Sequence, residues 1–333
     1  MREVLSGDDS LTRNLDQLYL PEKSYKPERG NKLPEKNQLL SQATEHQENN
    51  LQLLSQLTAR PEQQYLLTEN YLPLFIMQHY DQHYETMQMA LQQRALKKDY
   101  SSYTVTHKLN ATSATGKTIH IDASQQTIGS DESMAYDNEK PRHTVQLKPF
   151  SISTHPVSNS QYLAFMQDDG YSNCQYWSAE GWQWLNNNSS INAPAHWRQD
   201  TDKNWFEINT SGARDLHADK SLYGINYYEA RAYASWCKAR LAHEHEWECA
   251  QNKQLLSNSS QVWEWCSNRF YPYPGFKAFP YDGYSLPWFE QPHFVLRGAS
   301  PHTQHSIKRS SFRNFFGPDK RHIFAGCRLA YDE

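Results

Sequence analysis

The chain has 333 residues, a net charge of −4, a pI near 6.4 and a mean hydropathy of −0.89. The length suits two domains, and the slight acidity disfavours nucleic acid or an anionic membrane as partner. No apolar run approaches the roughly 18 residues of a membrane span, and we expect no signal peptide. Five cysteines without a CxxC pair disfavour a disulfide framework or a thiolate zinc site, and they favour a reducing, cytoplasmic setting.

Aromatic residues make up 13% of the chain, with 10 Trp and 21 Tyr. Large amphipathic rings can supply much of the buried area of such a polar chain. Gln and Asn are concentrated in the first hundred residues, so we expect the two halves to be built differently.

Helical periodicity dominates the first hundred residues. Residues 1–34, interrupted by prolines, predict an extended strap, and leucines recurring at three- and four-residue intervals predict a helix from Glu35 to Arg60-Pro61. A second helix is predicted from Pro61 to Ala95, with a kink or break at Pro73. Two helices alone cannot enclose a core, so either another chain supplies more helices or the bundle has lost its beginning.

The second helix carries His79 and His83, which are one turn apart and project from one face. Two imidazoles so placed are a common half-site for Zn or Fe(II), although two solvated histidines explain the pair equally well. Gln82 lies about 60° from His79 around the helix and could hold a substrate group. Glu85 lies about 240° from His79, which indicates a structural carboxylate behind the ligands.

After residue 100, short alternating segments predict strands at Thr118–Asp122, His143–Leu147 and Phe150–Thr154. The clearest helix is Asn226–Ala239, and the domain boundary is predicted near residues 100–115. His243-Glu-His245 is interpreted as the start of another helix, in preference to a metal site.

Residues 115–333 resemble a formylglycine-generating-enzyme-like (sulfatase-modifying factor) domain. The resemblance rests on ordered motifs: Tyr136-Asp-Asn-Glu-Lys-Pro-Arg-His143, Gln261-Val-Trp-Glu-Trp265, Val295-Leu-Arg-Gly-Ala-Ser300 and Phe324-Ala-Gly-Cys-Arg-Leu-Ala330. It implies an α+β fold in which an irregular, C-type-lectin-like domain follows a helical segment. The tryptophans and Arg297-Gly298 are expected to serve the core and the backbone geometry.

Formylglycine-generating enzymes have reactive cysteines after this Arg-Gly motif, whereas residues 297–312 contain none. His79-xxx-His83-x-Glu85 is similar instead to the DinB-like segment of ergothioneine and ovothiol sulfoxide synthases, so residues 35–100 are assigned as a partial DinB-like domain. The resemblance implies an Fe(II)- and O2-dependent enzyme that joins cysteine or γ-glutamylcysteine to the imidazole of hercynine (Nα-trimethylhistidine). It places iron on His79 and His83.

The resemblance also assigns substrate and proton-transfer roles. Gln82 would bond the substrate imidazole, and Tyr281 or Tyr284 would supply a proton during oxygen reduction. Asn314, Phe315 and Phe316 would line the betaine pocket, where aromatic faces attract a quaternary ammonium. This Asn-Phe-Phe departs from the Asn-Trp-Asp of other members, which puts the choice of thiol in doubt.

The family's third iron ligand is a histidine in an earlier bundle helix, and no matching segment precedes His79. His46 and His107 lie outside any matching context. We therefore expect an N-terminally truncated or split family member. The alternatives are a non-catalytic small-molecule-binding protein, or an interaction subunit that completes its bundle as a homo-oligomer or with a missing helical partner.

Overall fold

The computed structural model describes residues 9, 33–55, 64–113 and 116–332. The chain divides into two compact units, Met1–Ile76 and Met77–Glu333. Most of the strap predicted over residues 1–34, and the helix end predicted at Arg60-Pro61, fall outside the described residues.

The elements described in the first unit are all helical. They are α3 (Lys36–Ser55), α4 (Gln64–Leu67), the 3-10 turn η3 (Thr68–Asn70) and the start of α5 (Tyr71–Ala95). The break between α4 and α5 lies at Glu69 and Asn70, whose φ angles are 52° and 60°. Pro73 therefore falls in the first turn of α5, where a missing backbone N–H costs little. The side chains of α3 include no buried residue.

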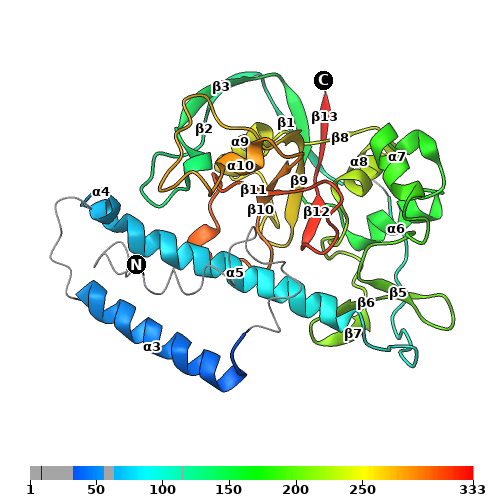
Figure 1. Cartoon of the computed structure of the whole chain (residues 1–333). Coiled ribbons are helices and arrows are strands. Elements are labelled where there is room, and N and C mark those ends of the chain that lie inside the picture. The colour runs from blue at the N-terminus through cyan, green and yellow to red at the C-terminus, as the bar shows by residue number, and fades with distance from the viewer. Residues whose placement is uncertain (1–8, 10–32, 56–63, 114–115, 333) are drawn as a thin grey trace. The chain divides into compact units, whose positions relative to one another are not determined.

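The second unit contains two four-stranded sheets and two smaller ones (Figure 1). The first sheet has the order β1-β4-β13-β8, and the second has the order β11-β10-β9-β12 with β12 parallel to β9. The strands predicted at residues 118–122, 143–147 and 150–154 are confirmed as β1, β3 and β4. The bounds of all strands are β1 Thr118–Ile121, β2 Ser124–Ile128, β3 His143–Leu147, β4 Phe150–Ser153, β5 Trp197–Gln199, β6 Trp205–Asn209, β7 Gly212–Asp215, β8 Arg240–Leu241, β9 Trp263–Arg269, β10 Phe294–Gly298, β11 Asn314–Phe316, β12 Ala325–Cys327 and β13 Leu329–Asp332.

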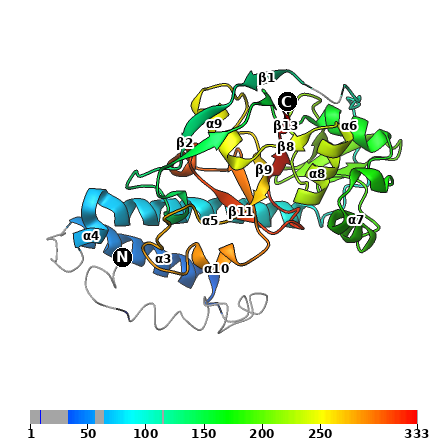
Figure 2. The same cartoon turned by 90° about the horizontal axis from the view of Figure 1, so that it is seen from above.

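Short helices complete this unit, and α6, α7 and α8 gather at one end of it (Figure 2). The helix predicted at Asn226–Ala239 is α8, with Asn226 as its N-cap. His243 is the N-cap of α9, so His243-Glu-His245 starts a helix as expected. The helix bounds are α6 Asn159–Gln167, α7 Ala179–Asn186, α8 Tyr227–Trp236, α9 Glu244–Asn252 and α10 Leu286–Phe289, with 3-10 turns η4 Asp137–Glu139, η5 Cys174–Tyr176 and η6 His305–Ile307.

The core of the second unit combines aromatic rings with buried ion pairs. Trp247, Trp263 and Trp265 are buried, and Trp247 Nε1 donates to Glu264 Oε2 at 2.8 Å. Arg328 closes a two-pronged pair on the same carboxylate at 2.7 and 2.8 Å. Such pairs define one arrangement of the chain, because breaking either partner leaves a buried charge uncompensated.

A second buried network joins α9 to β10 and to the segment that leads into β11. Arg297 donates to Glu244 and Glu248 at 2.9 and 2.8 Å, and Arg313 donates to Glu244 through Nε and Nη2 at 2.8 and 2.9 Å. These guanidinium groups hold the pKa of Glu244 well below its usual range, against the opposing effect of burial. At Gly298, where φ is +92°, a Cβ would lie 2.7 Å from the carbonyl oxygen of Ser259. The structural roles expected for Arg297 and Gly298 are confirmed.

Candidate functional site

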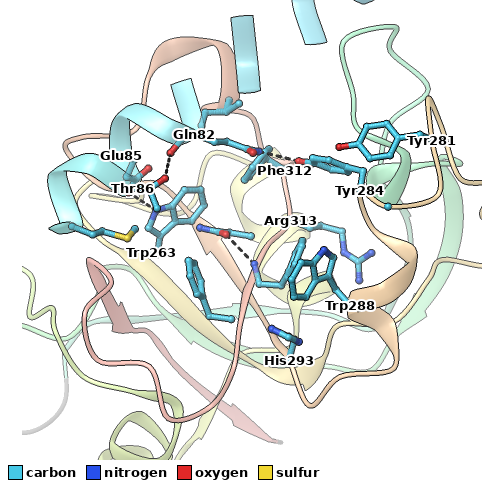
Figure 3. A pocket seen from close by; sticks show the side chains of 16 residues that line it. Gln82, Glu85, Thr86, Trp263, Tyr281, Tyr284, Trp288, His293, Phe312 and Arg313 are labelled. Carbon is cyan, nitrogen blue, oxygen red and sulfur yellow. Dashed lines mark hydrogen bonds between the residues drawn. The ribbon is translucent and has the colours of Figure 1, made fainter. Parts of the chain in front are cut away.

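A cavity of about 450 Å³ opens between the second part of α5 and the loops after β9 and β10 (Figure 3). Its wall includes Gln82 and Glu85 of α5, which lie within the second unit. Both predicted tyrosines and all three residues of the predicted betaine segment also line it. The lining comprises Gln82, Glu85, Thr86, Met89, Trp263, Tyr281, Gly283, Tyr284, Trp288, His293, Ile307, Phe312, Arg313, Asn314, Phe315 and Phe316.

Glu85 anchors α5 to this wall. Its carboxylate is buried and accepts hydrogen bonds from Trp263 Nε1 at 2.8 Å and Thr303 Oγ1 at 2.7 Å. Ser300 Oγ donates to Oε1 at 2.5 Å. Hydrogen bonds to a carboxylate are about twice as strong as neutral ones, so these three donors fix the position of the helix turn that carries Gln82.

Gln82 links α5 to the predicted proton donor, because its Nε2 donates to the Tyr284 hydroxyl at 2.9 Å (Figure 3). Burial raises the pKa of Tyr284 well above its ordinary value, which keeps the hydroxyl protonated near neutral pH. Tyr281 lies beside Tyr284 and is half exposed. The structure thus brings together Gln82 and Tyr284, which are separated by 202 positions in the sequence.

Aromatic rings form the opposite side of the cavity. Trp288, His293 and Phe315 pack against one another in this wall, with ring centroids 5.5 to 6.1 Å apart and the His293 ring nearly perpendicular to the other two. Phe315 also stacks on Phe270 at 4.0 Å, which fixes its orientation. Asn314 Oδ1 accepts from the backbone N–H of Phe315 at 2.9 Å. Aromatic faces that line a cavity can attract a quaternary ammonium group.

The two predicted metal ligands lie on α5 next to Gln82, but they are not part of the cavity lining. Nε2 of His79 and Nε2 of His83 are 2.9 Å apart. Two nitrogens at right angles on one ion, each about 2.1 Å from it, would be about 3 Å apart, so this pair fits a shared metal. Burial, together with the neighbouring His83, lowers the pKa of His79 and favours the neutral imidazole that a metal requires.

Two imidazoles are fewer ligands than a stable iron site requires. Within the described part of the chain, no group of three or more His, Cys, Asp or Glu residues could hold a metal ion. His46 lies on α3, and His107 contacts Thr106 and Asp215. The second unit therefore supplies one pair of imidazoles, and its His107 contacts other residues.

Sequence reasoning missed Trp288, His293 and Tyr136 as components of this region. Trp288 and His293 come from the irregular segment around α10, which has no periodicity to indicate which side chains face inward. Tyr136 belongs to a motif that was interpreted only as a mark of the domain. Only the folded chain shows that these residues approach Tyr284 and Phe315.

Comparison with known proteins relates part of the second unit to a known family. Residues 104–259 match the family model of the sulfatase-modifying factor enzyme 1-like domain. The chain is 32% identical over 249 residues to the hercynine oxygenase of Mycobacterium tuberculosis, a match that covers 61% of this chain and 57% of that protein. It is 33% identical over 253 residues to the hercynine oxygenase of Mycolicibacterium thermoresistibile, covering 61% of this chain and 55% of that protein.

The chain thus spans little more than half the length of these two relatives. Among solved structures, PvdO from Pseudomonas aeruginosa aligns with 69% of this chain and all of its own, with 16% identity and a TM-score of 0.46. The mixture of helices and sheets that the sequence predicts is confirmed. None of the described helices combines the length and the apolar character needed to cross a membrane.

Proposed function

We propose that this chain takes part in ergothioneine biosynthesis as an Fe(II)- and O2-dependent sulfoxide synthase. The reaction would join the sulfur of cysteine or γ-glutamylcysteine to the imidazole of hercynine. The imidazole C–H and the thiol S–H are lost, a C–S bond forms, and O2 supplies one oxygen atom to the sulfoxide and one to water. The similarity to two hercynine oxygenases supports this chemistry.

One observation carries the proposal: the hydrogen bond from Gln82 Nε2 to the Tyr284 hydroxyl in the cavity wall. It joins the helix that carries the imidazole pair to the residue expected to supply a proton. Because Nε2 is bonded to Tyr284, the amide oxygen of Gln82 is the atom that would accept from a substrate imidazole N–H. The substrate ring would then lie beside both the paired imidazoles and the Tyr284 hydroxyl.

The aromatic end of the cavity orients the other part of hercynine. Its trimethylammonium group would lie in the cavity against the aromatic wall that Trp288, His293 and Phe315 form, because aromatic faces attract a cation. Desolvation lowers the pKa of His293, so its ring is neutral and does not repel the ammonium group. Tyr281, half exposed, lies where the second substrate would enter.

Iron would be held by His79 and His83, and when bound it would activate O2. We propose that a further helix covers the exposed side of α5 and completes the ligand set. The apolar residues Met77, Tyr80, Tyr84, Met87 and Leu91 repeat with 3-4-3-4 spacing, and each is 40% to 66% exposed. Such a stripe is typical of a helix that packs along another helix. The helical segment would then be DinB-like and the following domain C-type-lectin-like.

Iron loading and product analysis together test this function. The full chain is loaded anaerobically with Fe(II), then supplied with hercynine, a thiol and O2, and the sulfoxide is measured by mass spectrometry. We expect iron binding and product formation, and we expect both to be lost in His83→Ala. His120→Ala is the matched control, because His120 lies on β1 and contacts Asp122.

A second candidate, a small-molecule-binding protein without turnover, is supported by the aromatic end of the cavity alone. Calorimetry with hercynine separates the two. Hercynine binding without iron uptake or product would support the binding protein and contradict the enzyme. No binding at millimolar hercynine, with no product, would contradict both.

A further inference from the structure

Tyr136 has no role in the function proposed so far, yet its ring lies directly against Tyr284. It is the residue immediately before η4, and its side chain is almost completely buried. The two phenol rings stack with centroids 4.4 Å apart and planes inclined by 18°. Phe312, which lines the cavity, meets the Tyr136 ring edge-on at 5.9 Å.

Arg309 fixes Tyr136 from a second side. Its guanidinium lies 5.6 Å from the centroid of Tyr136 and 5.3 Å from that of Phe312. The same group donates to Glu139 Oε2 at 2.8 Å and to Gln78 Oε1 on α5 at 2.7 Å. Glu139 Oε1 in turn accepts from the backbone N–H of Tyr136 at 2.9 Å. Arg309 therefore covers the ring of Tyr136, and its hydrogen bonds to Glu139 and Gln78 hold the guanidinium in that position.

The two residues after Tyr136 hold the loop that carries both predicted tyrosines. Asp137 accepts from the hydroxyl of Ser285 and from the backbone N–H of Phe279, the latter at 3.3 Å. Asn138 Nδ2 donates to the same Ser285 hydroxyl at 3.0 Å. Three consecutive residues thus bind the segment from Phe279 to Ser285, and Tyr136 is the one that contacts Tyr284 itself.

Gln82 holds the Tyr284 hydroxyl from the side of α5. Its Nε2 donates to Tyr284 Oη at 2.9 Å, which fixes the position of that oxygen in the cavity wall. After burial, the charge on the Tyr136 oxygen is the next influence that raises the pKa of Tyr284, so the two stacked phenols are also coupled electrostatically. Burial is the largest influence on both phenols and raises both pKa values, so both are protonated near neutral pH.

We propose that Tyr136 is a positioning residue for Tyr284, because its stacked ring holds the Tyr284 phenol in the cavity wall beside Gln82. The Tyr136 ring sets the plane of the Tyr284 phenol, and the nearby Tyr136 hydroxyl adds an electrostatic influence on the Tyr284 O–H. The consequence for turnover rests on the proposed function, in which Tyr284 supplies a proton. The physical coupling of the two tyrosines does not rest on it.

Fluorine NMR tests the coupling without any activity. 3-Fluorotyrosine is incorporated at position 284 of the full chain, and its 19F resonance is recorded in the parent and in Tyr136→Phe and Tyr136→Leu. We expect Tyr136→Phe to shift the resonance, because the electrostatic influence of the Tyr136 hydroxyl is lost while the stacked ring remains. Tyr136→Leu should shift it further and change its line width, because the ring loses its stacking surface. An unchanged resonance in both variants would overturn the proposal.

Tyr162→Phe is the matched control. Tyr162 is also completely buried, its hydroxyl lies 2.9 Å from that of Tyr171, and its ring stacks on Tyr233 at 5.4 Å, outside the cavity. It should also lose a buried tyrosine hydroxyl and leave the resonance at position 284 unchanged. If Tyr136→Leu fails to fold, the reciprocal measurement replaces it, with 3-fluorotyrosine at position 136 and Tyr284→Phe as the change.

Kinetics then test the consequence. We expect Tyr136→Phe to lower kcat about tenfold while KM for hercynine stays within about twofold, because proton supply is misdirected and the binding surface is intact. Equal losses in Tyr136→Phe and Tyr162→Phe would indicate a general structural effect and overturn the positioning role. A 19F shift in a chain that forms no sulfoxide would leave the tyrosine coupling standing and contradict the proposed function.

Discussion

Helix α3 and the second part of α5 are both rich in polar residues, yet they differ in how many of their side chains are buried. α3 runs for 20 residues without one buried side chain. The part of α5 within the second unit buries Gln78, Glu85, Met89, Gln92 and Ala95. Three of these five are polar, and each of the three has hydrogen-bond partners in the domain that follows.

This contrast shows that α5 is attached mainly by polar contacts. Gln78 Nε2 donates to the carbonyl oxygen of Met134 at 2.9 Å, and Gln92 donates to that of Ile208. Glu85 lies between these two glutamines along the helix, and its carboxylate accepts three hydrogen bonds. Buried polar groups of this kind tolerate few alternative positions, so they fix the rotation of the helix and the direction of Gln82. The apolar stripe of α5 faces elsewhere.

The strongest test of the contrast is Glu85→Ala. It leaves the donors of Trp263, Ser300 and Thr303 without their acceptor in a buried site, and we expect a loss of about 3 kcal/mol in the free energy of unfolding. Amide hydrogen exchange should also rise along α5 from Met77 to Ala95. Urea denaturation and exchange mass spectrometry measure the two effects.

Two control variants sharpen this result. Glu48→Ala removes an exposed carboxylate from α3 and should change stability by less than about 0.5 kcal/mol. Glu85→Gln keeps one acceptor oxygen and should lose less than the alanine variant. Equal losses in Glu85→Ala and Glu48→Ala would contradict the view that the two helices are held differently.

Acid should weaken the second unit and leave α3 unaffected. Burial lowers the pKa of His245 to about 3, whereas an unfolded histidine titrates near 6.5. Between these values the unfolded chain binds the extra proton, so stability falls as pH falls, by about 1.4 kcal/mol per pH unit. Urea denaturation at pH 7, 6 and 5 measures the slope, and His245→Phe should flatten it.

Exchange data across the same pH range separate the two regions. Corrected for intrinsic exchange rates, protection should decline in α9 and its neighbouring strands. It should stay low and constant in α3, which has no buried residue. A parallel decline of protection in α3 would show that this helix is packed as tightly as α5.

The sequence predicted where helices and strands occur better than it predicted which face of a helix packs against the rest of the domain. The strands at His143–Leu147 and Phe150–Ser153 and the N-caps of α8 and α9 follow from alternation and capping, which are local. On α5, the apolar positions Met77, Met87 and Leu91 are exposed. The attached face is polar, and hydrophobic periodicity carries no information about such a face.

The residues of the candidate site also divide into those that the sequence predicted and those that it did not. His79, Gln82 and His83 follow from helical spacing, and the resemblance supplied Tyr284, Asn314 and the two phenylalanines that follow it. Trp288, His293 and Tyr136 could not be found, because they lie on irregular segments whose places depend on distant contacts such as Arg313–Glu244 and Asp137–Ser285. Such contacts lie many residues apart and leave no local signature.

The aromatic end of the cavity should contribute a smaller, specific effect. Trp288→Ala removes one face that meets the proposed trimethylammonium group, and we expect hercynine affinity to fall by about 1 kcal/mol, roughly fivefold. Histidine, which lacks the three methyl groups, should lose less. Calorimetry with both ligands measures the difference, and equal losses would show that the ring acts only by filling space.

The smallest effect on stability, and the finest test of the contrast, comes from the apolar stripe. Met87 on α5 and Leu51 on α3 are almost equally exposed, at 58% and 59%. Glu in place of either should change the free energy of unfolding by less than about 0.5 kcal/mol, since neither side chain is buried. If the stripe binds a further helix, Met87→Glu alone should reduce the molecular mass measured by light scattering, because a charge in such a contact is poorly tolerated. Reduction of the mass by both variants would show that α3 contributes to the same assembly, and the two helices would then differ in their anchors but not in their function.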